Sequence, residues 1–138
     1  MRTAVATARG RPRTERRDRG SAVAEFAMVG SLVMVLFLAA FQVGFSLFVR
    51  NTLIANAAEG ARLGARVDSS TDAGAQRTRD LITTSLSPRY ARDVTATQER
   101  RNGMIVITVK VEAPLPVVGP FGPSQSLTIT AHAYKEKQ

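Results

Sequence analysis

A long apolar run near the N-terminus dominates the pattern of hydrophobic and polar positions. Residues 26–49 contain no ionisable side chain, and only Ser31, Gln42 and Ser46 interrupt the apolar and small residues. In a helix, which rises about 1.5 Å per residue, this run is about 36 Å long and can cross a hydrocarbon core about 30 Å thick. We therefore expect residues 26–49 to form a single transmembrane helix.

The helical pattern continues beyond the apolar run, over residues 51–66. Apolar residues recur there at three- and four-residue spacing: Leu53, Ile54, Ala57, Ala61 and Leu63. A stripe of small residues would allow another helix to approach closely: Ala57, Gly60, Ala61, Gly64 and Ala65. Two interpretations of the stripe stay open, a helix-packing surface or the Ala-rich composition of a high-GC genome. Glu59 either pairs with Arg62 at i+3 or is solvated.

A polar segment, residues 67–76, separates this helix from a second one. Asp72 is a candidate N-cap for a helix over about residues 73–86, and Ser87-Pro88 would stop that helix. Its apolar positions suit a helix laid on a sheet: Leu81, Ile82 and Leu86.

The remaining segments alternate as strands do. We expect a short strand over residues 94–98, a hairpin turn at Arg101-Asn102-Gly103, a strand over residues 104–112 and a last strand over residues 127–134. In the second strand, one face carries Ile105, Ile107, Val109 and Val111, and the other carries Thr108, Lys110 and Glu112. The predicted fold is a membrane-anchored α+β chain, in which one helix covers a three-stranded antiparallel sheet.

A loop rich in Pro and Gly, residues 114–123, joins the last two strands. Its apolar side chains either cover the open end of the small core or contact a partner or the membrane surface: Leu115, Val117, Val118 and Phe121. The predicted organisation is a basic leader (1–20), a long helix (21–66), a linker (67–76) and a head (77–138). A head of this size buries a limited core and depends on the stem or on neighbouring subunits for stability.

The net charge of +8 is concentrated in the N-terminal tail, because residues 1–20 hold seven Arg against Glu15 and Asp18. The rest of the chain has an ordinary charge balance without interleaved aromatics, which argues against a nucleic-acid surface. Positive charge before a membrane helix keeps that side in the cytoplasm. We therefore expect a cytoplasmic N-terminus and an extracytoplasmic head.

Candidate catalytic chemistry is sparse. The chain has no Cys, which excludes disulfides and thiol catalysis, and its one His, His132, excludes multi-His metal sites. His132 falls on the polar face of the last predicted strand, with no acid or Ser at a diagnostic spacing. No phosphate-binding loop or nucleophile elbow is present. We expect no enzymatic activity, no metal and no cofactor.

The junction between the basic tail and the apolar run is the most informative segment. Gly20 follows the Arg cluster, and Glu25 lies at the edge of the run, where a carboxylate is costly unless it is paired or solvated by headgroups. This order resembles the prepilin leader of type IV pilin-like proteins: a basic leader ending in Gly, a small residue, a Glu at the fifth position and a hydrophobic helix. The resemblance implies that a prepilin peptidase cuts the Gly20–Ser21 bond.

Cleavage would make Ser21 the new N-terminus, which is often methylated in this class. Ser21 and Glu25 are four residues apart, so they share a helix face. The resemblance implies that Glu25 binds the N-terminal amine of its own chain or of a neighbouring subunit, and a buried charge is well suited to fixing register.

The chain is further similar to the TadE-like family of the tight-adherence (Flp) pilus system, through motifs that cover about residues 19–66. They are Arg19-Gly20, Glu25-Phe26-Ala27, Gly44-Phe45-Ser46-Leu47-Phe48 and Ala57-Ala58-Glu59-Gly60-Ala61-Arg62. Two positions depart from the family pattern, which usually has Val where this chain has Ala24 and Pro near Gly30-Ser31; they leave the subfamily open.

The resemblance implies a minor pilin or pseudopilin in the bacterial cytoplasmic membrane, acting in pilus biogenesis or a related secretion apparatus. Its implied partners are the prepilin peptidase, other pilin or pseudopilin subunits and the pilus assembly platform, and not nucleic acid. The main alternative is an unprocessed signal-anchor protein whose head binds a partner or ligand. Two other processing signals stay open, signal-peptidase cleavage at Ala55-Asn56-Ala57 and a twin-arginine signal at Arg16-Arg17.

Overall fold

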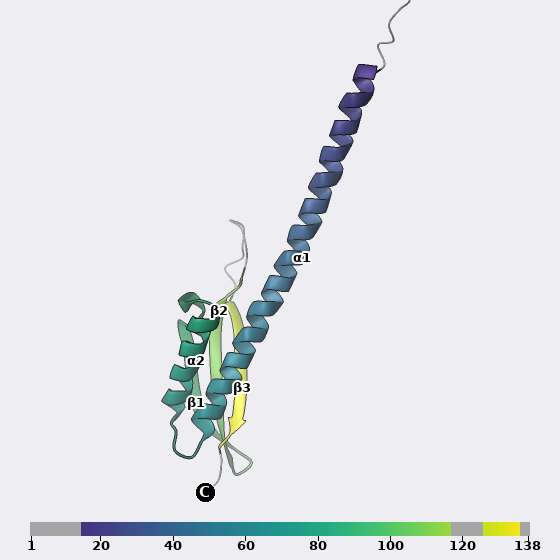
Figure 1. Ribbon diagram of the computed structural model, residues 1–138. Coiled ribbons are helices and arrows are strands. Elements are labelled where there is room, and N and C mark those ends of the chain that lie inside the picture. The colour runs from purple at the N-terminus through teal and green to yellow at the C-terminus, as the bar shows by residue number, and fades with distance from the viewer. Residues whose placement is uncertain (1–14, 117–125, 136–138) are drawn as a thin grey trace, which may run out of the picture. The chain divides into compact units, whose positions relative to one another are not determined.

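The computed structural model describes residues 15–116 and 126–135. Its elements, in chain order, are α1 (Glu15–Ala65), α2 (Thr71–Ser85), the 3₁₀ helix η1 (Pro88–Tyr90), β1 (Asp93–Arg101), β2 (Met104–Pro114) and β3 (Ser126–Tyr134). Figure 1 labels the two α-helices and the three strands. The chain divides into two compact units, Met1–Ala40 and Phe41–Gln138. The predicted α+β class, with one long apolar helix and a three-stranded sheet, is confirmed.

The first unit contains the N-terminal part of α1. The large apolar side chains between Val23 and Phe41 are each more than half exposed, and Phe26 reaches 81%. Among the described residues, Gly20–Ala65 is the one helical stretch long and apolar enough to cross a membrane. The helix begins at Glu15, so the end of the basic tail is helical as well.

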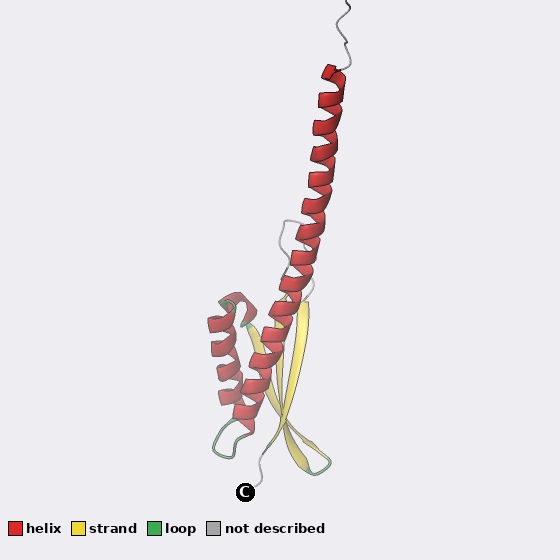
Figure 2. Cartoon of the chain, turned by 45° about the vertical axis from the view of Figure 1, so that its right-hand side comes forward, coloured by secondary structure: helices red, strands yellow, loops and turns green. Residues whose placement is uncertain are grey.

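The second unit has its core between two helices and one face of the sheet. Buried side chains of α1 recur every four residues, and they join Ile82 of α2 in one cluster with the inward face of the sheet: Val49, Leu53, Ala57 and Ala61. Figures 1 and 2 show the C-terminal part of α1 and α2 on the same face of the sheet. The sequence predicted one helix on the sheet, and the stem itself supplies a second.

The sheet has the order β1-β2-β3, and both neighbouring pairs are antiparallel. Asn102 (φ 51°) and Gly103 (φ 78°) join β1 to β2 and both lie in the left-handed region, as a two-residue type I′ hairpin requires. The register places Arg101 opposite Met104, so β1 continues to the turn. The predicted short strand of residues 94–98 is therefore too short. The residues of β1 near the turn, 97–101, are all exposed, so apolar and polar residues do not alternate there.

Helix α2 begins earlier than the sequence predicted. The Ser70 hydroxyl accepts a hydrogen bond from the Ala73 backbone N–H at 3.1 Å, and Ser70 has the extended backbone of an N-cap. The prediction of Asp72 as N-cap is wrong; Asp72 lies in the first turn, where its charge still favours the helix dipole. The segment between the helices is correspondingly shorter than residues 67–76. The predicted stop is confirmed, since α2 ends at Ser85 and Ser87 caps η1 at Pro88.

The start of the predicted Pro/Gly loop closes one end of the core. Leu115 is half-buried and Pro116 is fully buried, and the Pro116 carbonyl accepts a hydrogen bond from Gln42 Nε2 at 2.6 Å. This part of the loop therefore covers the core. Val117, Val118 and Phe121 lie outside the described residues.

Candidate processing and assembly segment

The predicted cleavage bond, Gly20–Ser21, lies inside α1. Both residues are exposed, and a Cβ added at Gly20 would have no heavy atom within 4 Å beyond its own helix. Gly is about 1 kcal/mol less favourable than Ala within a helix. The bond is thus exposed, and it lies at a point where the helix is intrinsically easier to unwind.

Glu25 shares a helix face with Ser21, as the four-residue spacing predicted. The Ser21 hydroxyl donates a hydrogen bond to Glu25 Oε1 at 3.4 Å, and both side chains are exposed. Among the side chains described from residue 20 onward, no cation forms an ion pair with Glu25. The carboxylate at the edge of the apolar run can therefore accept a positively charged donor.

The predicted small-residue stripe lies against α2. A Cβ at Gly60 would be 1.8 Å from Thr78 Oγ1 and 2.6 Å from the Gly74 carbonyl oxygen, and a Cβ at Gly74 would be 2.7 Å from the Gly60 carbonyl oxygen. The two helix backbones are therefore in contact, as small residues allow. At Gly64 the space is less restricted, because the nearest atom, Ile107 Cγ2, would be 3.3 Å away.

Ala57 and Ala61 from the same stripe are fully buried in the core of the second unit. The stripe is thus occupied within the chain and is not available to a second subunit in this fold. Glu59 and Arg62 are both described and exposed, and no ion pair joins them. Glu59 is therefore solvated.

The polar face of the sheet carries His132. Thr108 lies opposite His132 in the β2–β3 register, and Thr108 Oγ1 is 2.9 Å from His132 Nδ1. Among the side chains described, those of residues 20–116 and 126–135, no group of three or more His, Asp or Glu could hold a metal ion. On this face of the sheet, the Thr108 hydroxyl orients the imidazole of His132.

Sequence reasoning did not single out the groove beside Arg89 and Tyr90, which is described below. Its walls come from segments about 40 residues apart, so no local pattern could indicate it.

A comparison with family models supports the resemblance seen in the motifs. The model described as TadE-like protein matches residues 20–62, and the predicted similarity to this family is confirmed over that range. The match begins at the predicted cleavage position and ends at Arg62, before α2 and the sheet. No curated protein and no solved structure matches the chain.

Proposed function

Since residues 20–62 are TadE-like, we propose that this chain is a minor pilin or pseudopilin of a Tad/Flp-type pilus system. It is inserted in the bacterial cytoplasmic membrane with its N-terminus inside, cleaved after Gly20 by a prepilin peptidase, and acts as a non-enzymatic assembly component. The observation that carries the proposal is the placement of Gly20, Ser21 and Glu25 on an exposed helix that continues as an apolar run.

Cleavage changes the electrostatics of the helix start. Removal of residues 1–20 leaves the Ser21 ammonium at a helix N-terminus, where the helix dipole disfavours a positive charge. Glu25, which already accepts the Ser21 hydroxyl in the uncut chain, lies one turn away and offsets that cost. In an assembly, the same carboxylate would bind the amine of a neighbouring subunit and fix the register of the packed helices.

The surface available for such packing is the N-terminal part of α1. Its large apolar side chains between Val23 and Phe41 are exposed, whereas the small-residue stripe is covered by α2. Lipid covers the exposed face while the protein resides in the membrane, and neighbouring pilin or pseudopilin helices would cover it after assembly.

Co-expression of the full chain with a prepilin peptidase, followed by N-terminal sequencing and intact-mass measurement, tests the cleavage step. We expect a product that begins at Ser21, and slower cleavage of Gly20→Ala. Gly30→Ala is the matched control, because a Cβ at Gly30 also meets no atom within 4 Å. An intact Met1 terminus, or a start at Ala58, would refute the proposed processing.

The role of Glu25 in assembly is tested separately. Glu25→Val should be cleaved normally but should fail to support pilus formation, and the exposed Glu59→Gln should support it. Normal piliation in a Glu25→Val strain would refute the assembly role.

One observation favours a second candidate, an unprocessed signal-anchor protein whose head binds an envelope partner. The Gly20–Ser21 bond lies within a continuous helix that starts at Glu15, and an intact helix resists proteolysis. The same sequencing experiment separates the two functions, because the signal anchor keeps its Arg-rich tail.

A further inference from the structure

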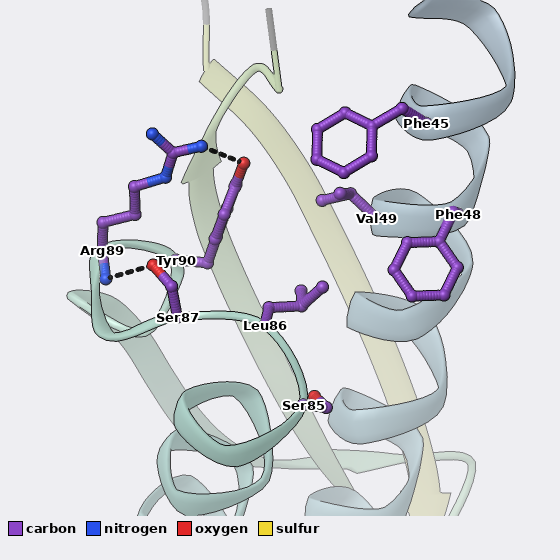
Figure 3. A pocket seen from close by; sticks show the side chains of 8 residues that line it. All are labelled: Phe45, Phe48, Val49, Ser85, Leu86, Ser87, Arg89 and Tyr90. Atoms are coloured by element: carbon purple, nitrogen blue, oxygen red, sulfur yellow. Dashed lines mark hydrogen bonds between the residues drawn. The ribbon is translucent and has the colours of Figure 1, made fainter. Parts of the chain in front are cut away.

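A groove opens in the second unit where α1 passes the C-terminal end of α2. Its volume is about 390 Å³, and eight residues line it: Phe45, Phe48, Val49, Ser85, Leu86, Ser87, Arg89 and Tyr90. Figure 3 shows the side chains of α1 on one side, Arg89 and Tyr90 on the other, and Leu86 between them. The groove has an apolar floor with one cation at its rim.

The cation is held in place by its neighbour. Arg89 Nη2 donates to the Tyr90 hydroxyl at 2.7 Å, and the Arg89 Cζ lies 4.7 Å from the centroid of the Tyr90 ring. The η1 turn that carries both residues is capped by Ser87, whose hydroxyl accepts from the Arg89 backbone N–H. Within the described residues no carboxylate pairs with Arg89. A guanidinium has five N–H donors, so most of its capacity remains for an oxyanion.

The length of the apolar run indicates where the groove lies relative to the membrane surface. Within the second unit, Gln42 Nε2 donates to the Pro116 carbonyl, so the head packs on α1 at this turn, while Leu47 and Phe48 stay more than half exposed. The part of the run that precedes Gln42, residues 26–41, is about 24 Å long as a helix, which is shorter than a hydrocarbon core of about 30 Å. The membrane boundary therefore reaches the turns that carry Phe45 and Phe48, and both line the groove.

We propose that this groove binds one anionic phospholipid from the leaflet on the head side of the membrane. The phosphate would lie on the Arg89 guanidinium, and an acyl chain would lie against Phe45, Phe48 and Leu86. The arrangement matches the order of a lipid across the interface, with apolar groups on the membrane run and the cation on the head. A guanidinium binds a phosphate through charge-assisted and often bidentate hydrogen bonds.

The inference rests on membrane insertion, which the proposed function also requires, but not on cleavage after Gly20. Lipid retention can be measured on the uncut and the cut chain alike. A failure of peptidase cleavage therefore leaves the lipid site standing, and loss of lipid retention leaves the processing proposal standing.

The test is native mass spectrometry of the full chain in detergent, with added phosphatidylglycerol or phosphatidylcholine. We expect the wild-type chain to retain one phosphatidylglycerol about tenfold better than phosphatidylcholine, because both lipids carry the phosphate but the choline ammonium of phosphatidylcholine offsets its charge and repels the Arg89 guanidinium. Arg89→Gln should remove the preference. Arg100→Gln, an exposed β1 residue outside the groove, is the matched control and should keep it.

A second variant and a competition experiment test the site independently of Arg89→Gln. Phe48→Ser removes an apolar wall from a side chain that is 57% exposed and leaves the Arg89–Tyr90 contact intact, so it should weaken retention of the lipid even if Arg89→Gln fails to fold. Millimolar inorganic phosphate should not displace the lipid. Equal retention of both lipids by the wild type, unchanged retention in a folded Arg89→Gln or in Phe48→Ser, or displacement by inorganic phosphate would each overturn the proposal.

Discussion

Replacing Gly60 with Ala tests the contact between α1 and α2 most directly. The added methyl would lie 1.8 Å from Thr78 Oγ1 and 2.6 Å from the Gly74 carbonyl oxygen. Thr78 is fully buried and its hydroxyl already donates to Gly74, so its side chain has little room to rotate. The Gly74 oxygen belongs to the backbone, and α2 must therefore move away from α1.

Two opposing terms set the magnitude. Overpacking a well-packed core costs about 1–3 kcal/mol, and a clash with backbone belongs at the upper end of that range. Ala is favoured over Gly in a helix by about 1 kcal/mol, which offsets part of the cost. We expect a net destabilisation of about 2 kcal/mol. For a domain of this size, each kcal/mol lowers the melting temperature by about 4–8 °C.

The buried Tyr90 gives a convenient signal, because the chain has no Trp and its other tyrosine, Tyr134, is exposed. Thermal unfolding of the full chain in detergent, followed by near-ultraviolet circular dichroism, should show a lower midpoint for Gly60→Ala. Gly44→Ala, on the same helix with no atom within 4 Å of the new Cβ, should be neutral or stabilising. Adding Thr78→Ala to Gly60→Ala should recover part of the loss. A Gly60→Ala midpoint equal to that of Gly44→Ala would refute the backbone contact.

Three further substitutions test the fold by the same unfolding measurement. Ser70→Ala should cost about 1 kcal/mol through loss of the N-cap, and more than Asp72→Ala; the reverse order would contradict the assigned start of α2. Gly103→Ala should cost about 1–2 kcal/mol, because φ is 78° there, and an unchanged midpoint would contradict the turn geometry. Ile82→Ala should cost about 2–5 kcal/mol, because the side chain is fully buried; a cost below 1 kcal/mol would contradict its place in the core.

Features set by local sequence could be predicted. The length of the apolar run can be read from the sequence without knowledge of what packs on it. The Asn102-Gly103 pair favours a tight hairpin when it lies between two strands. The alternation in β2 and β3 places the buried face correctly, with Val109, Val111 and Ile129 inside. The end of α2 follows from Ser87-Pro88, since the residue before a proline leaves the helical region.

The misplaced boundaries depend on contacts outside the local sequence. Ser70 and Asp72 are both good N-caps, and the choice between them depends on how the chain leaves α1 and reaches α2. The outer part of β1 has no buried face, so no alternation marks it as a strand. Pairing with β2 through the hairpin holds it in the sheet.

The proposed processing site, Gly20 with Glu25, is visible in the sequence because all of its parts lie within one helical turn or two of each other. The sequence does not show which element packs on the small-residue stripe, because Gly60 indicates only that another segment can approach closely. The structure identifies Gly74 and Thr78 as what approaches. The groove beside Arg89 likewise exists only after α1 and the end of α2 meet.

The sequence by itself determined that this protein has a helix long and apolar enough to span a membrane, a leader-like junction at Gly20 and a small α+β head, because each rests on hydropathy or spacing between near neighbours. Only the tertiary structure decided that the last turns of the apolar run and the small-residue stripe belong to the core of the head. The physical reason is that an apolar or small side chain is equally suited to lipid, to another subunit or to its own sheet, and only packing selects among them.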